Sequence, residues 1–223
     1  TFEPTPTLEP TPTFTLPPTF TPPPPPSQSL TEDTLIDDFS SNQFGWTVEM
    51  DQQSSFGFQD NRYFIQVYED GWRMWESIPT DFTPTYLSFT AQIEAGNAGL
   101  GYYGMVCNVQ NNENYHYIEI DPALRRYRIG FMTSEEEYYL TPYEWNYSFY
   151  LSGDPYAVNQ IGVRCTNDTI RLEINGELET EVSFAPAEPG GWVGLLASTW
   201  DAESLPTGGF TVYFDDLYAT TRE

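Results

Sequence analysis

From Leu35 to the end, the chain is a succession of short runs rich in β-branched and aromatic residues, separated by turn sequences. Typical runs are RYFIQVYE and FTVYFDDLYA, and typical turns are QNNEN and EPGG. In EINGEL, Asn175 and Gly176 supply the two residues that tolerate positive φ in a tight hairpin. Because no stretch shows a convincing helical period, the pattern predicts an all-β fold, a two-sheet antiparallel sandwich.

The first 26 residues have a different composition, with eleven Pro and eight Thr. Pro fixes φ and favours polyproline II, so we expect an extended rod that reaches roughly 80 Å at about 3.1 Å per residue. The polar stretch SQSLTEDT then separates this rod from the strand-rich region. The sequence therefore predicts three parts: a Pro/Thr-rich rod at 1–26, a polar linker at 27–34 and a β-sandwich at 35–223.

A large apolar residue returns every six positions along the predicted rod, at Phe2, Leu8, Phe14 and Phe20. Six residues are two turns of polyproline II, which places the four side chains on one side of the rod. This stripe has two interpretations. It is a passive product of repeat duplication, or it docks on the protein's own domain or on other copies of the chain and builds a filament.

Alternation of Thr and Pro is typical of O-glycosylated stalks at cell surfaces. We therefore expect an extracellular, cell-surface protein that carries glycans on the rod. The candidate O-glycosylation sites are Thr5, Thr7, Thr11, Thr13, Thr15, Thr19 and Thr21.

The chain is strongly acidic, with 33 Asp and Glu residues against eight basic residues and a net charge of -25. Only Glu3 and Glu9 fall in the rod, so nearly all of this charge belongs to the remaining region. Such a field repels nucleic acid and anionic membrane surfaces, so we expect neither as a partner. No apolar run reaches the length of a membrane-spanning helix, and we expect no transmembrane segment.

The chain contains two cysteines, Cys107 and Cys165, each inside a strand-like run. They pair in an oxidising compartment, and the alternative is a pair of buried free thiols. Cysteine number alone leaves both interpretations open.

Several runs together resemble the concanavalin A-like lectin/glucanase domains of bacterial surface proteins. The opening run LIDDFSSNQFGWTV is similar to the first strand of that family, and YYGMVCNVQNNENYHYIEID is similar to one of its hairpins. NQIGVRCTNDTIRLEINGELETEVSF, GGWVGLLAST and FTVYFDDLYA resemble its later strands. The resemblance implies a jelly-roll sandwich and a disulfide between Cys107 and Cys165. It implies no single function, because this fold is shared by lectins, glycosidases and spacer domains.

Glucanases of this family carry the strand motif Glu-x-Asp-x-x-Glu, whose outer acids perform the hydrolysis. The nearest match is Glu119-Ile120-Asp121, but Leu124 occupies the place of the third acid. We therefore expect no catalytic residues, and glycoside hydrolase activity is disfavoured and stays the third alternative. We interpret Glu119 and Asp121 as a solvated strand face and turn.

Two kinds of binding are compatible with the remaining residues. Aromatic side chains suited to a sugar or a protein partner are Trp72, Trp75, Tyr115, Tyr117, Tyr143 and Trp145. Four aspartates on the first and last predicted strands are weak calcium candidates: Asp37, Asp38, Asp215 and Asp216. We expect no other cofactor. The sequence therefore favours a non-enzymatic structural or adhesive surface protein, with a carbohydrate-binding module on a passive stalk as the alternative and polysaccharide as its partner.

Overall fold

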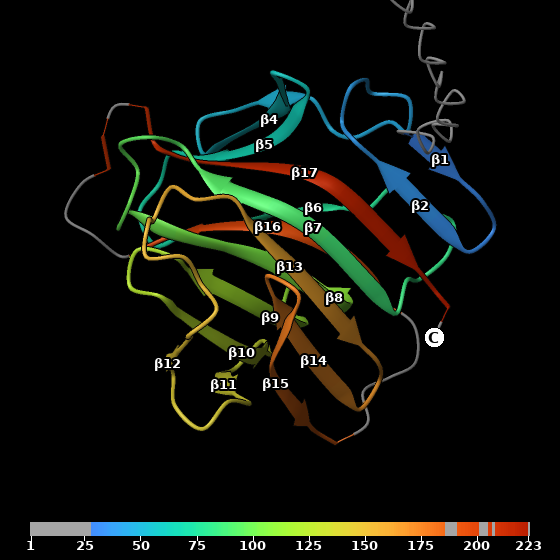
Figure 1. Ribbon diagram of the computed structural model, residues 1–223, viewed down its shortest axis with the longest axis vertical. Helices are drawn as coiled ribbons and strands as arrows, with labels where there is room; N and C mark the ends of the chain where they lie inside the picture. Colours follow the sequence, from blue (N-terminus) through green and yellow to red (C-terminus); the bar gives the residue numbers. More distant parts are fainter. Residues whose placement is uncertain (1–27, 186–190, 201–204, 207, 223) are drawn as a thin grey trace, which may run out of the picture.

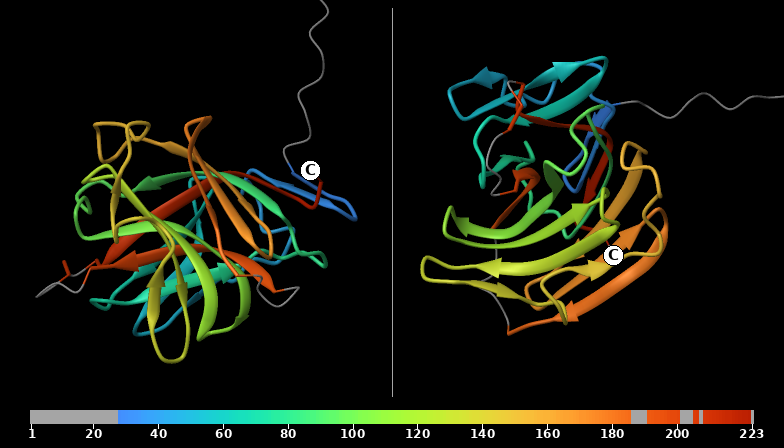
Figure 2. Two further views of the ribbon diagram at one scale, coloured as in Figure 1. Left: turned by 90° about the horizontal axis from the view of Figure 1, so that it is seen from below. Right: turned by 90° about the vertical axis from the view of Figure 1, so that its left-hand side faces the viewer.

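A computed structural model of the chain describes residues 28–185, 191–200, 205–206 and 208–222. Within these ranges every regular secondary-structure element is a β-strand. The strands form two antiparallel sheets that pack face to face (Figures 1 and 2). The predicted all-β jelly-roll sandwich is therefore confirmed. No described segment forms a helix able to cross a membrane.

The larger sheet, sheet A, contains ten of the described strands in the order β15-β14-β13-β7-β17-β5-β4-β3, with β2 on β17 and β1 on β2. Its strands are β1 (Gln28–Leu30), β2 (Thr34–Asp37), β3 (Glu49–Met50), β4 (Ser54–Gln59), β5 (Arg62–Val67), β7 (Tyr86–Ile93), β13 (Asn159–Cys165), β14 (Thr169–Ile174), β15 (Glu177–Ser183) and β17 (Phe210–Thr220). Strand β17 is long enough to pair with two successive neighbours on one edge. Its first half pairs with β5 and its second half with β2, beyond a register shift between Asp215 and Tyr218.

The smaller sheet, sheet B, contains seven of the described strands in the order β11-β10-β9-β8-β16-β6, with β12 paired to β10. Its strands are β6 (Arg73–Ser77), β8 (Gly101–Asn111), β9 (Asn114–Asp121), β10 (Arg126–Met132), β11 (Glu137–Tyr139), β12 (Asn146–Tyr147) and β16 (Trp192–Thr199). Alternate residues of β9 face opposite sides. Ile118 and Ile120 join the core between the sheets, whereas Tyr115 and Tyr117 belong to a separate cluster on the outer face of sheet B.

Cys107 and Cys165 form a disulfide, as the family resemblance implied. The bond joins β8 of sheet B to the end of β13 of sheet A and therefore connects the two layers across the core. His116 lies opposite Cys107 in the β8–β9 ladder and is buried. Its imidazole packs between Phe131 and Phe184, with ring centroids 4.7 Å and 4.2 Å apart.

The N-terminal limit of the sandwich differs from the prediction. We expected residues 27–34 to be a polar linker, but residues 28–30 form β1 and pair with β2. The side chain of Gln28 donates to Asp37 over 2.8 Å, which fixes this short strand to the sheet. The rod predicted at 1–26, with its apolar stripe and its candidate glycosylation sites, lies outside the described residues.

Candidate functional site

A network of ion pairs occupies the centre of the outer face of sheet B. Glu119 of β9 accepts hydrogen bonds from two guanidinium groups, Arg73 Nε to Oε1 over 2.7 Å and Arg128 Nε to Oε2 over 2.5 Å. Arg73 also donates to Glu137 Oε1 over 3.0 Å and to Tyr115 Oη over 3.1 Å. Strands β6, β9, β10 and β11 are thereby joined by one set of charge-assisted hydrogen bonds.

The network is shielded from solvent. Glu119 is fully buried and Arg128 is 5% exposed. Burial acts to lower the pKa of Arg73, but the negative charge of Glu119 and the interactions with Tyr115 and Tyr102 together hold that pKa well above its ordinary value. Burial acts to raise the pKa of Glu137, but the hydrogen bond and charge of Arg73 prevail and lower it. The arginines therefore remain cationic, and both oxygens of Glu119 are bound by them.

This arrangement corrects the interpretation of Glu119 and Asp121 as a solvated strand face and turn. Both side chains are buried, and Asp121 Oδ2 accepts a hydrogen bond from Arg126 Nε over 2.9 Å. Leu124, at the place of the third acid of the glucanase motif, is 59% exposed in the β9–β10 turn. Arg73 is 46 positions from Glu119, so local sequence gave no sign of that pair, whereas Arg128 and Arg126 pair with Glu119 and Asp121 within the β9–β10 hairpin.

Beside the network, the indoles of Trp75 and Trp192 border a depression at the β6 edge of the same face, and Tyr115 packs against Trp75. The ring centroids of Trp75 and Tyr115 are 4.9 Å apart, and those of Trp75 and Trp192 are 6.4 Å apart. The depression has a volume of about 370 Å³. Its lining residues are Arg73, Met74, Trp75, Glu76, Ser77, Asn112 and Trp192.

The alternation of β6 explains how this depression is formed. Met74 packs against the core between the sheets, so Arg73 and Trp75 face the opposite side of the strand. The pairing of Leu196 with Trp75 brings β16 alongside β6, and Trp192 begins β16. The indoles of two strands far apart in sequence thus meet at one edge of sheet B.

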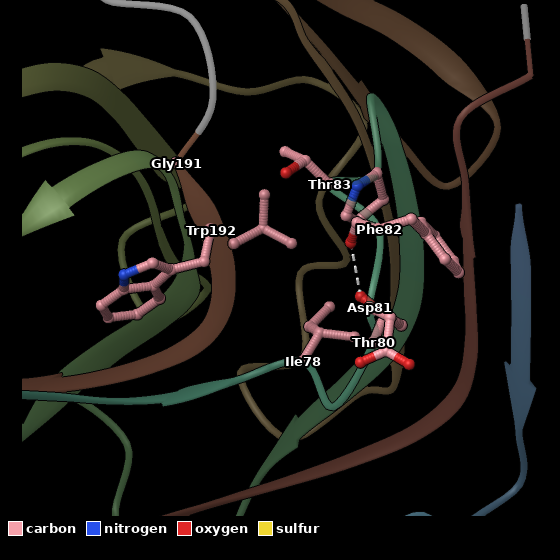
Figure 3. A pocket seen from close by; sticks show the side chains of 9 residues that line it. Ile78, Thr80, Asp81, Phe82, Thr83, Gly191 and Trp192 are labelled. Atoms are coloured by element: carbon pink, nitrogen blue, oxygen red, sulfur yellow. Dashed lines mark hydrogen bonds between the residues drawn. The ribbon is translucent and has the colours of Figure 1, made fainter. Parts of the chain in front are cut away.

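A second depression, of about 260 Å³, lies between the 78–84 segment and the start of β16 (Figure 3). The Thr80 hydroxyl donates to the carbonyl of Phe82 over 2.7 Å and stabilises a tight turn there. In Figure 3 the indole of Trp192 extends away from this turn, so the ring does not face the second depression. The aromatic residues of the second lining are Phe82 and Trp192, whereas the pair formed by Trp75 and Trp192 belongs to the first depression.

The structure separates the predicted aromatic candidates into three groups. Trp75, Tyr115 and Tyr117 lie together around Arg73, whose guanidinium carbon is 4.4 Å from the Tyr117 ring centroid. Trp145 instead packs against Tyr102 and Trp200, at centroid distances of 5.4 Å and 5.3 Å. Trp72 and Tyr143 are exposed by 39% and 73%, outside both groups.

Of the residues that line the depression, only Trp75 was among the sequence candidates, and the main additions are Arg73 and Trp192. Arg73 had a detectable signal, because it stands two positions before Trp75 in an extended run and so shares its face. Trp192 had none, because its distance from Trp75 depends on the pairing of β16 with β6.

The calcium candidates do not form a metal-binding group. Asp37 is buried and accepts hydrogen bonds from Trp46 Nε1 over 2.7 Å and from the Phe39 amide over 2.9 Å. Burial raises its pKa, and burial likewise raises the pKa of Asp215. Within the described ranges, no three His, Cys, Asp or Glu side chains are grouped so that they could hold a metal ion.

Comparison with known proteins places the fold but not the family. No protein-family model and no curated protein matches the sequence. Among solved structures, the chain is similar to the carbohydrate-binding module CBM66 from Bacillus subtilis, with a TM-score of 0.60 at 13% identity, covering 82% of this chain and 99% of that one. It is also similar to a Bacillus licheniformis β-glucanase, with a TM-score of 0.61 at 8% identity and coverages of 86% and 100%.

A third similar structure is a Bacillus subtilis protein of unknown function with a galectin-like fold, with a TM-score of 0.60 at 10% identity and coverages of 83% and 94%. At these identities the likeness concerns the backbone alone. The chain therefore has the concanavalin A-like jelly-roll fold that carbohydrate-binding modules and glucanases share.

Proposed function

We propose that this protein is a non-enzymatic carbohydrate-binding domain, and that it binds a sugar ring in the depression bordered by Trp75 and Trp192. The observation that carries the proposal is the meeting of these two indoles at a cavity of about 370 Å³, with Tyr115 packed against Trp75. Such a volume lies within the usual range for small-ligand sites. Indole faces offer apolar surface to the C–H faces of a pyranose, while their edges and neighbours remain polar.

The lining also supplies hydrogen-bonding groups for sugar hydroxyls. The amide of Asn112 and the hydroxyl of Ser77 are each both donor and acceptor, and Arg73 adds a cationic donor. A few polar groups set in an aromatic wall are typical of sites that fix the orientation of a small ligand.

The state of Glu119 supports binding without hydrolysis. A retaining glycosidase needs one carboxylate free to attack the sugar and a second carboxyl about 5 Å away as the acid. Both oxygens of Glu119 are held by guanidinium groups, and Asp121 is paired with Arg126. Both carboxylates are also fully buried, so neither is accessible to a sugar ring.

The test is binding of soluble oligosaccharides by calorimetry, after a glycan array has selected the ligand. We expect Trp75→Ala to weaken binding about tenfold or more, since removal of a central aromatic contact commonly costs over 1.4 kcal/mol. Trp72→Ala is the matched control, because Trp72 is exposed and outside the depression. Equal binding by both variants, or release of reducing ends from the bound glycan, would contradict the proposal.

We place this domain at the cell surface, displayed on the Pro/Thr-rich rod as an adhesive or structural unit. The disulfide supports an oxidising compartment, and the acidic surface supports solubility at high exposure. Polymerisation through residues 1–26 is the finer form of this proposal, and the apolar stripe of the rod supports it. Electron microscopy of the native protein is the direct test of a filament.

A further inference from the structure

One corner of the domain exposes large apolar side chains to solvent. We define the distal patch as Leu124, Arg125, Tyr147 and Phe149. Phe149 is 79% exposed, Leu124 59% and Tyr147 52%. The rings of Tyr147 and Phe149 meet edge to face with centroids 5.0 Å apart, and the Arg125 guanidinium lies 5.4 Å from the Tyr147 centroid.

The backbone beneath the distal patch is held by several hydrogen bonds. Arg125 donates from its guanidinium to the carbonyl of Phe149 over 3.1 Å, and its own carbonyl accepts from the Ser148 amide over 2.8 Å. The Ser148 hydroxyl accepts from the amides of Tyr150 and Leu151, each over 3.2 Å. The exposed rings thus project from an ordered loop, and a ligand that binds them meets a pre-organised surface.

Exposed aromatic clusters on a soluble domain usually mark an interaction site. In a chain with a net charge of -25, the partner of such a cluster is restricted by electrostatics. An acidic partner is repelled, and a folded copy of the same domain carries the same negative field. The partner that fits is therefore apolar, only weakly charged and able to contact aromatic rings.

The chain itself contains a segment with these properties. We propose that the distal patch is the receptor for residues 1–26 of a second copy of this chain, a proposal that rests on the display role suggested above. Pro-rich segments of polyproline II dock on aromatic-lined surfaces and lose little entropy, and the stripe of the rod offers apolar side chains at regular intervals. Glu3 and Glu9, the two charges of that segment, complement Arg125.

The position of the domain's first strand favours a second copy over the same copy. Strand β1 lies at the opposite end of the sandwich from β12, which carries Tyr147 (Figures 1 and 2). A sandwich of this size is roughly 40 Å across, whereas a polyproline II rod of 26 residues extends roughly 80 Å. The segment expected to form this rod is therefore long enough to reach beyond its own domain to a patch on another copy.

Contact between the rod of one copy and the patch of the next is heterologous, with different surfaces on the two sides. Such contacts do not end with a dimer. After two copies bind, one still has a free rod and the other a free patch, so further copies add and the assembly grows linearly. This assigns a surface to the self-association that the apolar stripe suggested.

The test uses two full-length variants and their mixture. The patch variant is Phe149→Ser with Tyr147→Ser, and the rod variant replaces the four stripe residues Phe2, Leu8, Phe14 and Phe20 by Ser. The matched control is Val48→Ser with Met50→Ser, which removes two side chains that are 64% and 73% exposed beside β3. Light scattering after size-exclusion chromatography measures assembly, and circular dichroism checks the fold.

We expect the native chain and the control to form linear assemblies, and each of the two variants to require at least about tenfold higher concentration to assemble. Mixing the patch variant with the rod variant should give 1:1 dimers that grow no further, because only one intact rod and one intact patch then meet.

Three results would overturn the proposal: a monomeric native chain at all concentrations, monomers in the mixture, or assembly that survives in the rod variant but fails in the patch variant. The last result would indicate contact between two patches. Failure of sugar binding is detected separately, because Trp75→Ala should leave assembly unchanged while the patch variant should leave sugar binding unchanged.

Discussion

The guanidinium of Arg73 on β6 reaches across β16 and β8 and binds the carboxylate of Glu119 on β9, with Nε and Oε1 2.7 Å apart. This contact covers the centre of the outer face of sheet B and leaves the aromatic depression beside it open. The same side chain therefore takes part in both features: it neutralises the acid that a glucanase would use and it lines the proposed sugar site.

The first prediction concerns the stability supplied by this network. Glu119→Gln should lower the free energy of unfolding by about 3–5 kcal/mol, because it leaves two poorly solvated guanidinium groups without their counter-charge. Urea denaturation at pH 7 measures the loss. In the control, Glu173→Gln removes a partner from the more exposed pair with Arg171, and the cost should stay below about 1 kcal/mol. Equal losses in the two variants would show that burial adds nothing to the network.

The second prediction concerns acid stability and His116. Burial between two phenyl rings lowers the pKa of His116 from its ordinary 6.5 to about 4. Between these pH values the unfolded chain binds a proton that the folded chain does not, so stability falls as the pH is lowered through this window. Above pH 6.5 the effect vanishes, and at pH 4.5 it reaches about 2–3 kcal/mol.

His116→Asn removes this titration together with some packing. The free energy by which the variant is less stable than the native chain should therefore shrink by about 2–3 kcal/mol between pH 7.5 and pH 4.5. Urea denaturation of both proteins at the two pH values gives this difference, in which the contributions of the carboxylates cancel. A difference that stays constant with pH would mean that the imidazole titrates alike in both states.

The third prediction concerns the close packing of Tyr117 over β10. A Cβ added at Gly130 would come within 2.0 Å of the Tyr117 hydroxyl and 2.6 Å of the Tyr138 carbonyl oxygen, so ring and strand must both move. Gly130→Ala should destabilise the fold by about 1–3 kcal/mol, measured by thermal unfolding. Gly153→Ala is the control, since its added Cβ meets no atom within 4 Å. If both substitutions leave the melting temperature unchanged, the packing is looser than these contacts indicate.

Sequence patterns located the elements of the fold because those patterns are local. The period of two in RYFIQV, repeated in run after run, places one apolar face inward, and the strand β5 alternates as expected. Asn175 and Gly176 both adopt positive φ, as the tight hairpin required. Adjacent residues suffice for such inferences, which is why the sandwich was predictable, whereas the short strand β1 inside the expected linker was not.

The candidate site was only partly predictable, because it depends on pairings between distant strands. Trp75 and Tyr115 were recognised as candidates, yet nothing in the sequence placed them within one cluster or set Trp145 apart from them. The distant partner of Glu119, Arg73, was also hidden, although its second partner, Arg128, is only nine positions away. The acid was assigned to a solvated face. Whether a charged side chain is buried depends on the side chains that neighbouring strands place around it.

The sequence by itself determined the strand-rich fold class, the acidic charge and the Pro/Thr-rich composition of residues 1–26 with an apolar residue every six positions, since composition and local period specify these properties. Only the tertiary structure decided that Arg73 would bind Glu119, that Trp192 would join Trp75, and that Tyr147 and Phe149 would be exposed on one surface. The physical reason is that strand order and register bring together side chains that are tens of residues apart in sequence. The sequence of a single strand does not specify which strands pair with it.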